Sequence, residues 1–149
     1  MVHVIRTESS SEVHRSIEDV FAYLVDFGNL PEYEPWVASV ARTSTGDIGV
    51  GSTWTHQRVQ GRRHIEAPIE LVEVDRPRKF AMVSGSRGFD VRSTMTFTAL
   101  DAQCTRVDEV LEMRLSGMVR LFEPMIRRQA PKQAVEVHAR LKEVLERKE

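Results

Sequence analysis

The chain has 149 residues, the length of one domain that can bury a core of its own. Hydrophobic residues make up 41% and charged residues 29%, which is typical of a folded globular protein and unlike a disordered chain. The 21 basic and 22 acidic side chains nearly cancel, so no basic surplus indicates a nucleic-acid partner. The single cysteine, Cys104, excludes an internal disulfide and a cysteine-rich zinc site. We therefore expect one domain over residues 1–149.

No apolar run reaches the roughly 20 residues that a membrane span needs. The first residues also lack the apolar stretch and cleavage site of a signal peptide. We therefore expect a cytoplasmic protein without an integral membrane segment. No motif has the spacing of a metal site or a phosphate-binding loop, so we expect no metal and no cofactor.

The first part of the chain predicts a strand followed by two short helices. The strand covers residues 5–15, and its polar face is typical of a position near a sheet edge. Ser16 is a suitable N-cap for the first helix, which is expected to end at Phe27-Gly28 with Gly28 as a left-handed terminator. A second short helix or turn is expected over residues 29–33.

The central part of the chain predicts six strands joined by hairpins, because apolar and polar side chains alternate there. The strands are expected over 37–43, 52–59, 62–74, 79–84, 89–100 and 106–115. Gln60-Gly61 is expected to form a two-residue turn. Val72 and Val74 depart from the alternation and predict a bulge at that strand end. Sequential hairpins of this kind form an antiparallel sheet.

From Gly117 onward the apolar period becomes helical. One face of this helix carries Met118, Leu121, Phe122, Met125, Ile126, Val137, Leu141, Val144 and Leu145. Pro124 and Pro131 each remove a backbone N–H, so we expect the helix to be kinked or broken near Arg127. The helix is the only element large enough to cover one face of the sheet. The sequence therefore predicts an α+β fold of about seven antiparallel strands, two short helices after the first strand and a long C-terminal helix.

Strand alternation also predicts which side chains face the helix-covered side of the sheet. A turn at Gln60-Gly61 places Trp54 opposite Ala67 and His56 opposite Ile65. Ile69 continues this apolar face, so Trp54 and His56 are expected to point inward with it.

In the last hairpin, an odd-length loop over residues 101–105 puts Phe97 and Glu109 on the same inward face. Glu109 is then a carboxylate in an apolar row, which is costly unless it is paired or protonated. We interpret it as a general acid/base or a ligand anchor; a bulge that turns it outward, or an arginine partner, is the structural alternative.

Candidate site residues follow from these faces. Glu109 and His56 are the candidate catalytic pair, because a carboxylate and a histidine can take up a proton and return it elsewhere. A buried histidine with satisfied hydrogen bonds is the alternative for His56. Together with these two, the expected ligand-binding residues are Trp36, Trp54, Met95, Phe97, Met113, Phe122 and Met125. A stripe of this kind also suits an ordinary core.

The chain resembles the polyketide cyclase/dehydrase-like family of the START-related, Bet v 1-like superfamily (SRPBCC). The residues that carry the resemblance are Ser16-Ile17-Glu18-Asp19-Val20-Phe21, Leu24-Val25-Asp26-Phe27, Leu30-Pro31-Glu32-Tyr33, Pro35-Trp36-Val37, Val50-Gly51-Ser52-Thr53-Trp54, Val74-Asp75-Arg76-Pro77-Arg78, Met95-Thr96-Phe97, Thr105-Arg106-Val107 and Leu121-Phe122-Glu123-Pro124-Met125. They cover nearly the whole chain. Pro131 departs from the family, which more often continues a regular helix there.

The resemblance implies a helix-grip fold, in which a curved antiparallel sheet wraps around the C-terminal helix and leaves an internal pocket. It implies binding of a small hydrophobic or aromatic molecule in that pocket, with lipids among such ligands. The alternative is a cyclase or dehydratase in which Glu109 and His56 transfer protons. The stretch Glu32-Tyr33-Glu34-Pro35-Trp36 also resembles the coenzyme Q-binding branch, so a quinone-binding or protein-partner module is a further alternative. The expected partner is the small ligand, and a homodimer stays open.

Overall fold

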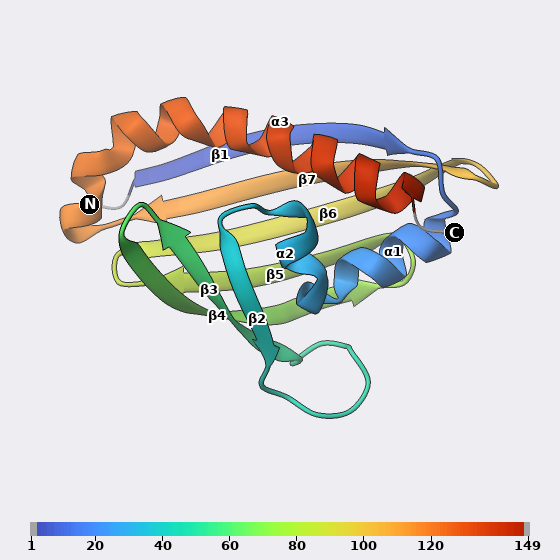
Figure 1. Ribbon diagram of the computed structural model, residues 1–149, viewed down its shortest axis with the longest axis horizontal. Coiled ribbons are helices and arrows are strands. Elements are labelled where there is room, and N and C mark those ends of the chain that lie inside the picture. Colours follow the sequence, from blue (N-terminus) through green and yellow to red (C-terminus); the bar gives the residue numbers. More distant parts are fainter. Residues whose placement is uncertain (1–2, 148–149) are drawn as a thin grey trace.

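In the computed structural model, which describes residues 3–147, seven strands form one antiparallel sheet (Figure 1). The strands are β1 (His3–Val13), β2 (Val37–Arg42), β3 (Thr53–Gln60), β4 (Arg63–Asp75), β5 (Lys79–Ser86), β6 (Phe89–Asp101) and β7 (Cys104–Leu115). Their order in the sheet is β1-β7-β6-β5-β4-β3-β2, so β1 lies at an edge as its polar face predicted. The α+β, helix-grip architecture expected from the sequence is confirmed.

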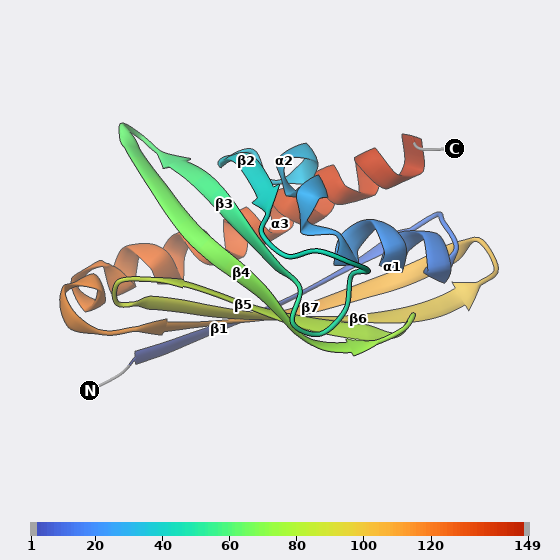
Figure 2. The ribbon, with the colours of Figure 1, turned by 90° about the horizontal axis from the view of Figure 1, so that it is seen from below.

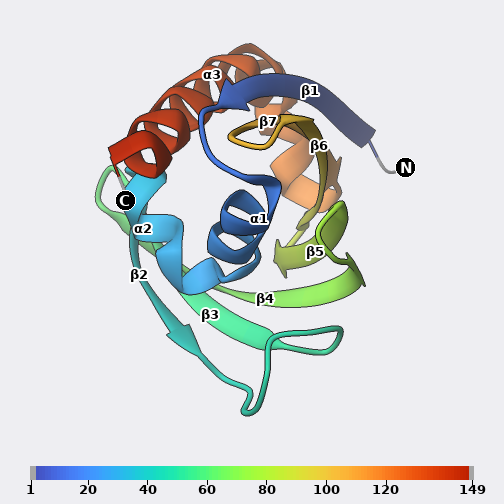
Figure 3. The same ribbon diagram turned by 90° about the vertical axis from the view of Figure 1, so that its right-hand side faces the viewer.

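The sheet is strongly curved and has two distinct faces. Figure 3 shows it bent around the first helix, α1 (Ile17–Val25), with the long C-terminal helix, α3 (Glu123–Arg147), lying across the open side. Figure 2 shows the β3–β4 hairpin extending away from the other strands. We call the face toward α1 and α3 the concave face and the opposite one the outer face.

Between β1 and β2 the chain forms α1, a 3-10 turn η1 (Phe27–Asn29) and the one-turn helix α2 (Leu30–Tyr33). The Ser16 side chain caps α1 as predicted, accepting a hydrogen bond from the Asp19 backbone N–H at 3.3 Å. The predicted end of this helix was wrong, because α1 ends at Val25 and Gly28 does not have a left-handed backbone conformation. The Asp26 carboxylate instead accepts from the Gly28 N–H and starts η1.

The β3–β4 hairpin has the predicted inward face but a different register. Gln60 pairs with Arg63, so the turn lies one residue later than predicted. Trp54 consequently pairs with Ile69 rather than Ala67, and His56 pairs with Ala67 rather than Ile65. Moving a two-residue turn by one position shifts each partner by two residues, and side chains two residues apart share a face. Trp54 and His56 therefore still point inward and are buried.

The inward faces of β6 and β7 are the predicted ones, but the odd-length loop over residues 101–105 was wrong, because β6 runs to Asp101, β7 starts at Cys104 and a register shift lies between Ala99 and Asp101. Met95 pairs with Glu109 and Phe97 pairs with Val107, so Glu109 lies on the concave face. The bulge expected at the end of β4 is also present, between Leu71 and Glu73. Phe21 of α1 packs against this face, and its ring centroid lies 5.5 Å from that of Phe97 on β6.

The C-terminal segment begins with the 3-10 helix η2 (Gly117–Phe122) and continues as α3. Pro124 lies in the first turn of α3, where a missing N–H costs little. Helix α3 continues through Pro131, so it is not broken there, and Figure 1 shows it bending over the sheet rather than running straight. The α3 residues Leu141 and Leu145 are buried in the core, as predicted.

Gly88 closes the β5–β6 turn against the start of η2. Its φ is +75°, and a Cβ there would lie 2.7 Å from the Ser116 carbonyl oxygen and 3.0 Å from Val119. We expect Gly88→Ala to lower the free energy of unfolding by about 2–4 kcal/mol, because left-handed strain and a clash with backbone add together. Gly46 has a φ of +84° in open space, so Gly46→Ala should cost only about 1 kcal/mol. Urea denaturation of both variants makes the comparison, and equal losses would contradict the predicted clash.

Candidate functional site

Glu109 lies at the centre of a polar cluster on the concave face. The Ser93 hydroxyl donates to Glu109 Oε2 at 2.7 Å, and His138 Nε2 of α3 lies 3.3 Å from Glu109 Oε1. Only 14% of the Glu109 side chain and 6% of the His138 side chain are exposed. The carboxylate therefore has the partners that an inward-facing charge requires.

His138 also links α3 to the edge strand β1. Its Nε2 lies 3.0 Å from Ser9 Oγ, and its Nδ1 lies 2.9 Å from Ser11 Oγ. A ring that carries its proton on Nε2 donates toward Glu109 and Ser9 and accepts at Nδ1 from the Ser11 hydroxyl. The cluster thus joins Glu109 on β7 to α3 and to the edge strand β1.

A second polar cluster lies where α2 meets β2 and β3. The Trp36 indole N–H donates to Glu34 Oε1 at 3.1 Å, and the Arg58 guanidinium carbon lies 6.0 Å from the centroid of the Trp36 ring. Glu34, Trp36 and Arg58 are all partly exposed. This cluster combines a carboxylate, a guanidinium and an aromatic surface that solvent can reach.

The pKa of the Glu34 carboxyl group lies near neutral pH. Burial raises its pKa to about 7 against the opposing charge of Arg58, and the negative charge of Glu109 adds to the rise. The Glu109 charge also helps to raise the pKa of Tyr33, behind the larger effect of burial. The charge of Glu109 therefore acts on both Tyr33 and Glu34.

His56 is buried on β3 and contacts Ser84 rather than Glu109. Ser84 Oγ lies 3.4 Å from His56 Nε2, and His56 Nδ1 has no hydrogen-bond partner among the described residues. Burial and then the charge of Arg58 lower its pKa to about 4, so the ring is neutral at pH 7. No hydrogen bond joins His56 to Glu109 within residues 3–147, so their cooperation stays a prediction.

The predicted apolar site residues divide into two groups. Trp54, Met95, Phe97 and Met113 are at most 6% exposed and belong to the core. Phe122 and Met125 are 52% and 49% exposed near the start of α3. Their assignment to a ligand site remains a prediction.

The concave face is accessible to solvent toward the end that carries the β3–β4 turn. Inward-facing side chains there, including Ile65, Ser84, Val91 and Leu111, are only partly buried. Toward the opposite end the same face is closed by α1, where Phe80 and Phe97 are almost fully buried. The two polar clusters therefore lie beside the accessible part of an otherwise apolar surface.

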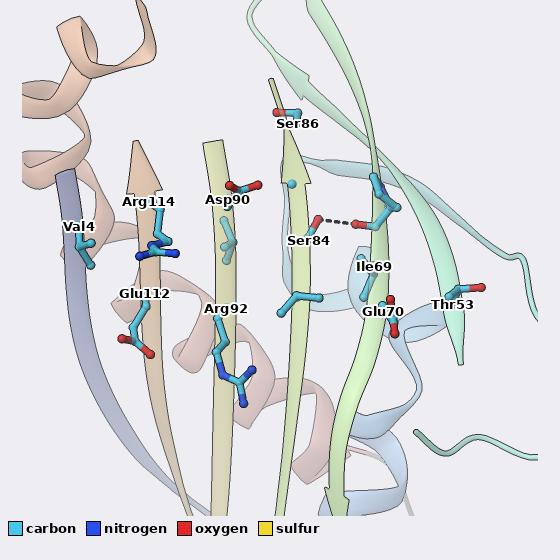
Figure 4. A pocket seen from close by; sticks show the side chains of 14 residues that line it. Val4, Thr53, Ile69, Glu70, Ser84, Ser86, Asp90, Arg92, Glu112 and Arg114 are labelled. Atoms are coloured by element: carbon cyan, nitrogen blue, oxygen red, sulfur yellow. Dashed lines mark hydrogen bonds between the residues drawn. The ribbon is translucent and has the colours of Figure 1, made fainter. Parts of the chain in front are cut away.

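The outer face of the sheet carries a separate hollow of about 910 Å³ (Figure 4). Figure 4 shows its side chains spread from Val4 on β1 to Thr53 on β3, with α3 behind the sheet. Arg92 and Arg114 lie there with Glu70, Asp90 and Glu112, so both signs of charge line the hollow. It is distant from the Glu109 and Glu34 clusters because those side chains point to the opposite face.

The sequence analysis did not select Arg58, His138 or Glu34 as site residues, although the periodicity of the sequence indicates the inward position of the first two. Arg58 follows Trp54 and His56 in the inward alternation of β3, and His138 falls on the buried stripe of α3. Glu34 has no such signal, since it lies in an irregular segment between α2 and β2. Within residues 3–147, no group of three or more His, Cys, Asp or Glu side chains could hold a metal ion.

The sequence from residue 4 to residue 146 matches the family described as polyketide cyclase/dehydrase and lipid transport. The chain belongs to this family. Membership of this family is consistent with ligand binding or with polyketide cyclase activity, and it identifies no specific substrate. No curated protein matches the chain in sequence.

Solved structures confirm the fold. The Zhui aromatase/cyclase from Streptomyces sp. R1128 is 13% identical with a TM-score of 0.80, covering 97% of this chain and 95% of that one. A START superfamily protein from Mycobacterium smegmatis is 14% identical with a TM-score of 0.79, covering 95% and 97%. Norcoclaurine synthase from Thalictrum flavum, in complex with dopamine and hydroxybenzaldehyde, is 21% identical with a TM-score of 0.68, covering 99% and 90%. At these identities the likeness concerns the fold alone.

Proposed function

We propose that the protein binds a small hydrophobic or aromatic molecule between the concave face of the sheet and α3. The observation that carries this proposal is the pair of polar clusters beside the accessible part of an apolar face. Ligand sites typically combine an apolar wall with a few fixed polar groups that orient the ligand. Family membership supports the same class of ligand.

The two clusters give the ligand different contacts. Trp36 offers an aromatic surface, and Arg58 offers N–H donors for a carbonyl or phenolate oxygen. Glu109 accepts hydrogen bonds and is already held in position by Ser93 and His138. An aromatic molecule with oxygen substituents at its rim suits this arrangement.

Native mass spectrometry of freshly purified protein, followed by organic extraction, tests whether a ligand accompanies it. A titration with the fluorescent probe anilinonaphthalene sulfonate then tests the site. Arg58→Gln should weaken probe binding about tenfold, because the charge-assisted hydrogen bond from the guanidinium to the probe's sulfonate is lost. Arg92→Gln is the matched control, since Arg92 lies exposed in the hollow on the outer face.

Unchanged affinity in Arg58→Gln together with weaker binding in Arg92→Gln would place the ligand in the outer hollow and contradict the proposal. The absence of both a copurifying molecule and saturable probe binding would contradict it as well. Thermal melts of both variants confirm that they are folded.

A second candidate function is a cyclase or dehydratase, which one observation favours. The pKa of Glu34 is raised to about 7, the range in which a carboxyl group can both donate and accept a proton at neutral pH. Besides Glu34, the Glu109 carboxylate and the His138 imidazole, 3.3 Å apart, provide two further groups that can transfer protons. Acting as base and acid, these groups would remove a proton from a carbon beside a carbonyl of a bound polycarbonyl and deliver a proton to a hydroxyl on the next carbon, which leaves as water as the double bond forms.

Mass analysis of an extracted ligand before and after incubation with the protein separates the two functions. Dehydration lowers the ligand mass by one water, and Glu34→Gln or Glu109→Gln should abolish this change while binding is retained. A ligand that leaves the wild-type protein unaltered supports a binding protein without chemistry.

A further inference from the structure

One end of the molecule exposes apolar side chains that no element within residues 3–147 covers. Met118, Leu121, Phe122 and Met125 of η2 and α3 are 79%, 74%, 52% and 49% exposed. These four residues lie within an eight-residue stretch, and we call them the apolar tip. Exposed apolar groups scattered singly are ordinary, whereas a contiguous group marks a surface that contacts another apolar phase.

Positive charge surrounds the apolar tip. Residues 114–135 contain five basic side chains and a single carboxylate, Glu123. That carboxylate is already paired with Arg127 and His3. Arg128 and Lys132 are exposed and have no ion-pair partner among residues 3–147. Helical spacing puts both on the exposed side of α3 that also carries Met125.

Two further turns add basic residues to the same end of the long axis. The β5–β6 turn, which carries Arg87, contacts η2 through the Ser116 N–H and the Gly88 carbonyl oxygen at 2.9 Å. The β3–β4 turn carries Arg62 and Arg63, and it lies at this end in Figures 1 and 2. All three arginines are exposed. The end of the molecule thus presents the apolar tip together with exposed basic side chains from three segments, Arg62, Arg63, Arg87, Arg128 and Lys132, which we call the basic ring.

We propose that the apolar tip and its basic ring form a docking surface for an anionic lipid bilayer. The apolar side chains enter the interfacial region while the arginines and Lys132 contact acidic headgroups. A second copy of the chain is a poorer occupant, because it would bring two positively charged ends together. No helix within residues 3–147 is long and apolar enough to cross a membrane, so the contact is peripheral.

Flotation with lipid vesicles tests the proposal on the full chain. We expect binding to vesicles of equal parts phosphatidylcholine and phosphatidylglycerol, weaker binding to phosphatidylcholine alone, and a loss of binding at high salt. Leu121→Ser should lower the partition coefficient about tenfold, since one leucine no longer enters the interface. Val50→Ser is the matched control, because Val50 is 68% exposed in the β2–β3 loop, away from the apolar tip.

The double variant Arg128→Gln/Lys132→Gln isolates the charge. It should reduce binding to the anionic vesicles while leaving binding to phosphatidylcholine unchanged. Three results would overturn the proposal: no vesicle binding by the wild type, equal binding by Leu121→Ser and Val50→Ser, or a dimer that Leu121→Ser dissociates without any vesicle binding. Circular dichroism shows whether each variant is folded.

Discussion

Replacing Leu141 with alanine should lower the free energy of unfolding by about 2–5 kcal/mol, the range for a leucine lost from a packed core. Leu141 has no exposed surface and packs in the main core cluster with Val137 and Leu145. The core beneath it includes the interlocked rings of Phe21 and Phe97, which leave little freedom to close the gap. Urea or guanidinium denaturation measures the loss.

Val135→Ala is the control for this prediction. Val135 lies on the same helix and is 70% exposed, so its replacement should change the free energy of unfolding by less than about 0.5 kcal/mol. A loss at Leu141 no larger than at Val135 would show that α3 is peripheral to the cooperative unit. Such a result would also remove α3 as a stable wall for the proposed ligand.

Local periodicity was sufficient to predict the faces of the sheet. The turn after β3 was misplaced by one residue, yet Trp54 and His56 still point inward because the error moved their partners by two positions. The inward position of Glu109 followed in the same way from the alternation in β7. Side chains two residues apart in a strand share a face. A turn misplaced by one residue therefore changes every predicted cross-strand pair but leaves the predicted faces correct.

The partners of Glu109 could not be predicted in this way. They come from β6, which is adjacent in the sheet, and from α3, whose rotation brings His138 over Ser9 and Ser11 of the edge strand. No period within one segment encodes the rotation of a helix over a distant strand. The pKa of Glu34 depends even more on tertiary structure, since it reflects burial together with the charges of Arg58 on β3 and Glu109 on β7.

Glu34→Gln and His56→Gln should change the pH dependence of stability in opposite directions. The pKa of Glu34 is raised from 4.5 to about 7, so between these values the native state holds more protons than the unfolded state. Its contribution to stability therefore falls as the pH rises. The pKa of His56 is lowered from 6.5 to about 4, so the unfolded state holds more protons there and stability rises with pH.

Each pKa change corresponds to about 3 kcal/mol across its window. Because the windows overlap between pH 4.5 and 6.5, the two contributions oppose each other in the wild-type protein. Without Glu34, the stabilising contribution of His56, which rises with pH, is no longer opposed. The free energy of unfolding of Glu34→Gln should therefore increase relative to wild type as the pH rises toward 7. Removing His56 leaves the Glu34 effect, so the His56→Gln protein should lose stability over the same range.

Denaturant unfolding of both variants and the wild type at several pH values between 4 and 8 measures these differences. Subtracting the wild-type curve removes the contributions of all other titrating groups. The double variant Glu34→Gln/His56→Gln is the control, and it should regain a curve parallel to that of the wild type between pH 4.5 and 6.5. Single-variant curves that run parallel to the wild type would show that neither group is desolvated on the concave face. That outcome would also remove the carboxyl group on which the enzymatic alternative depends, since a Glu34 that titrates at its ordinary pKa is fully ionised at neutral pH and holds no proton to donate.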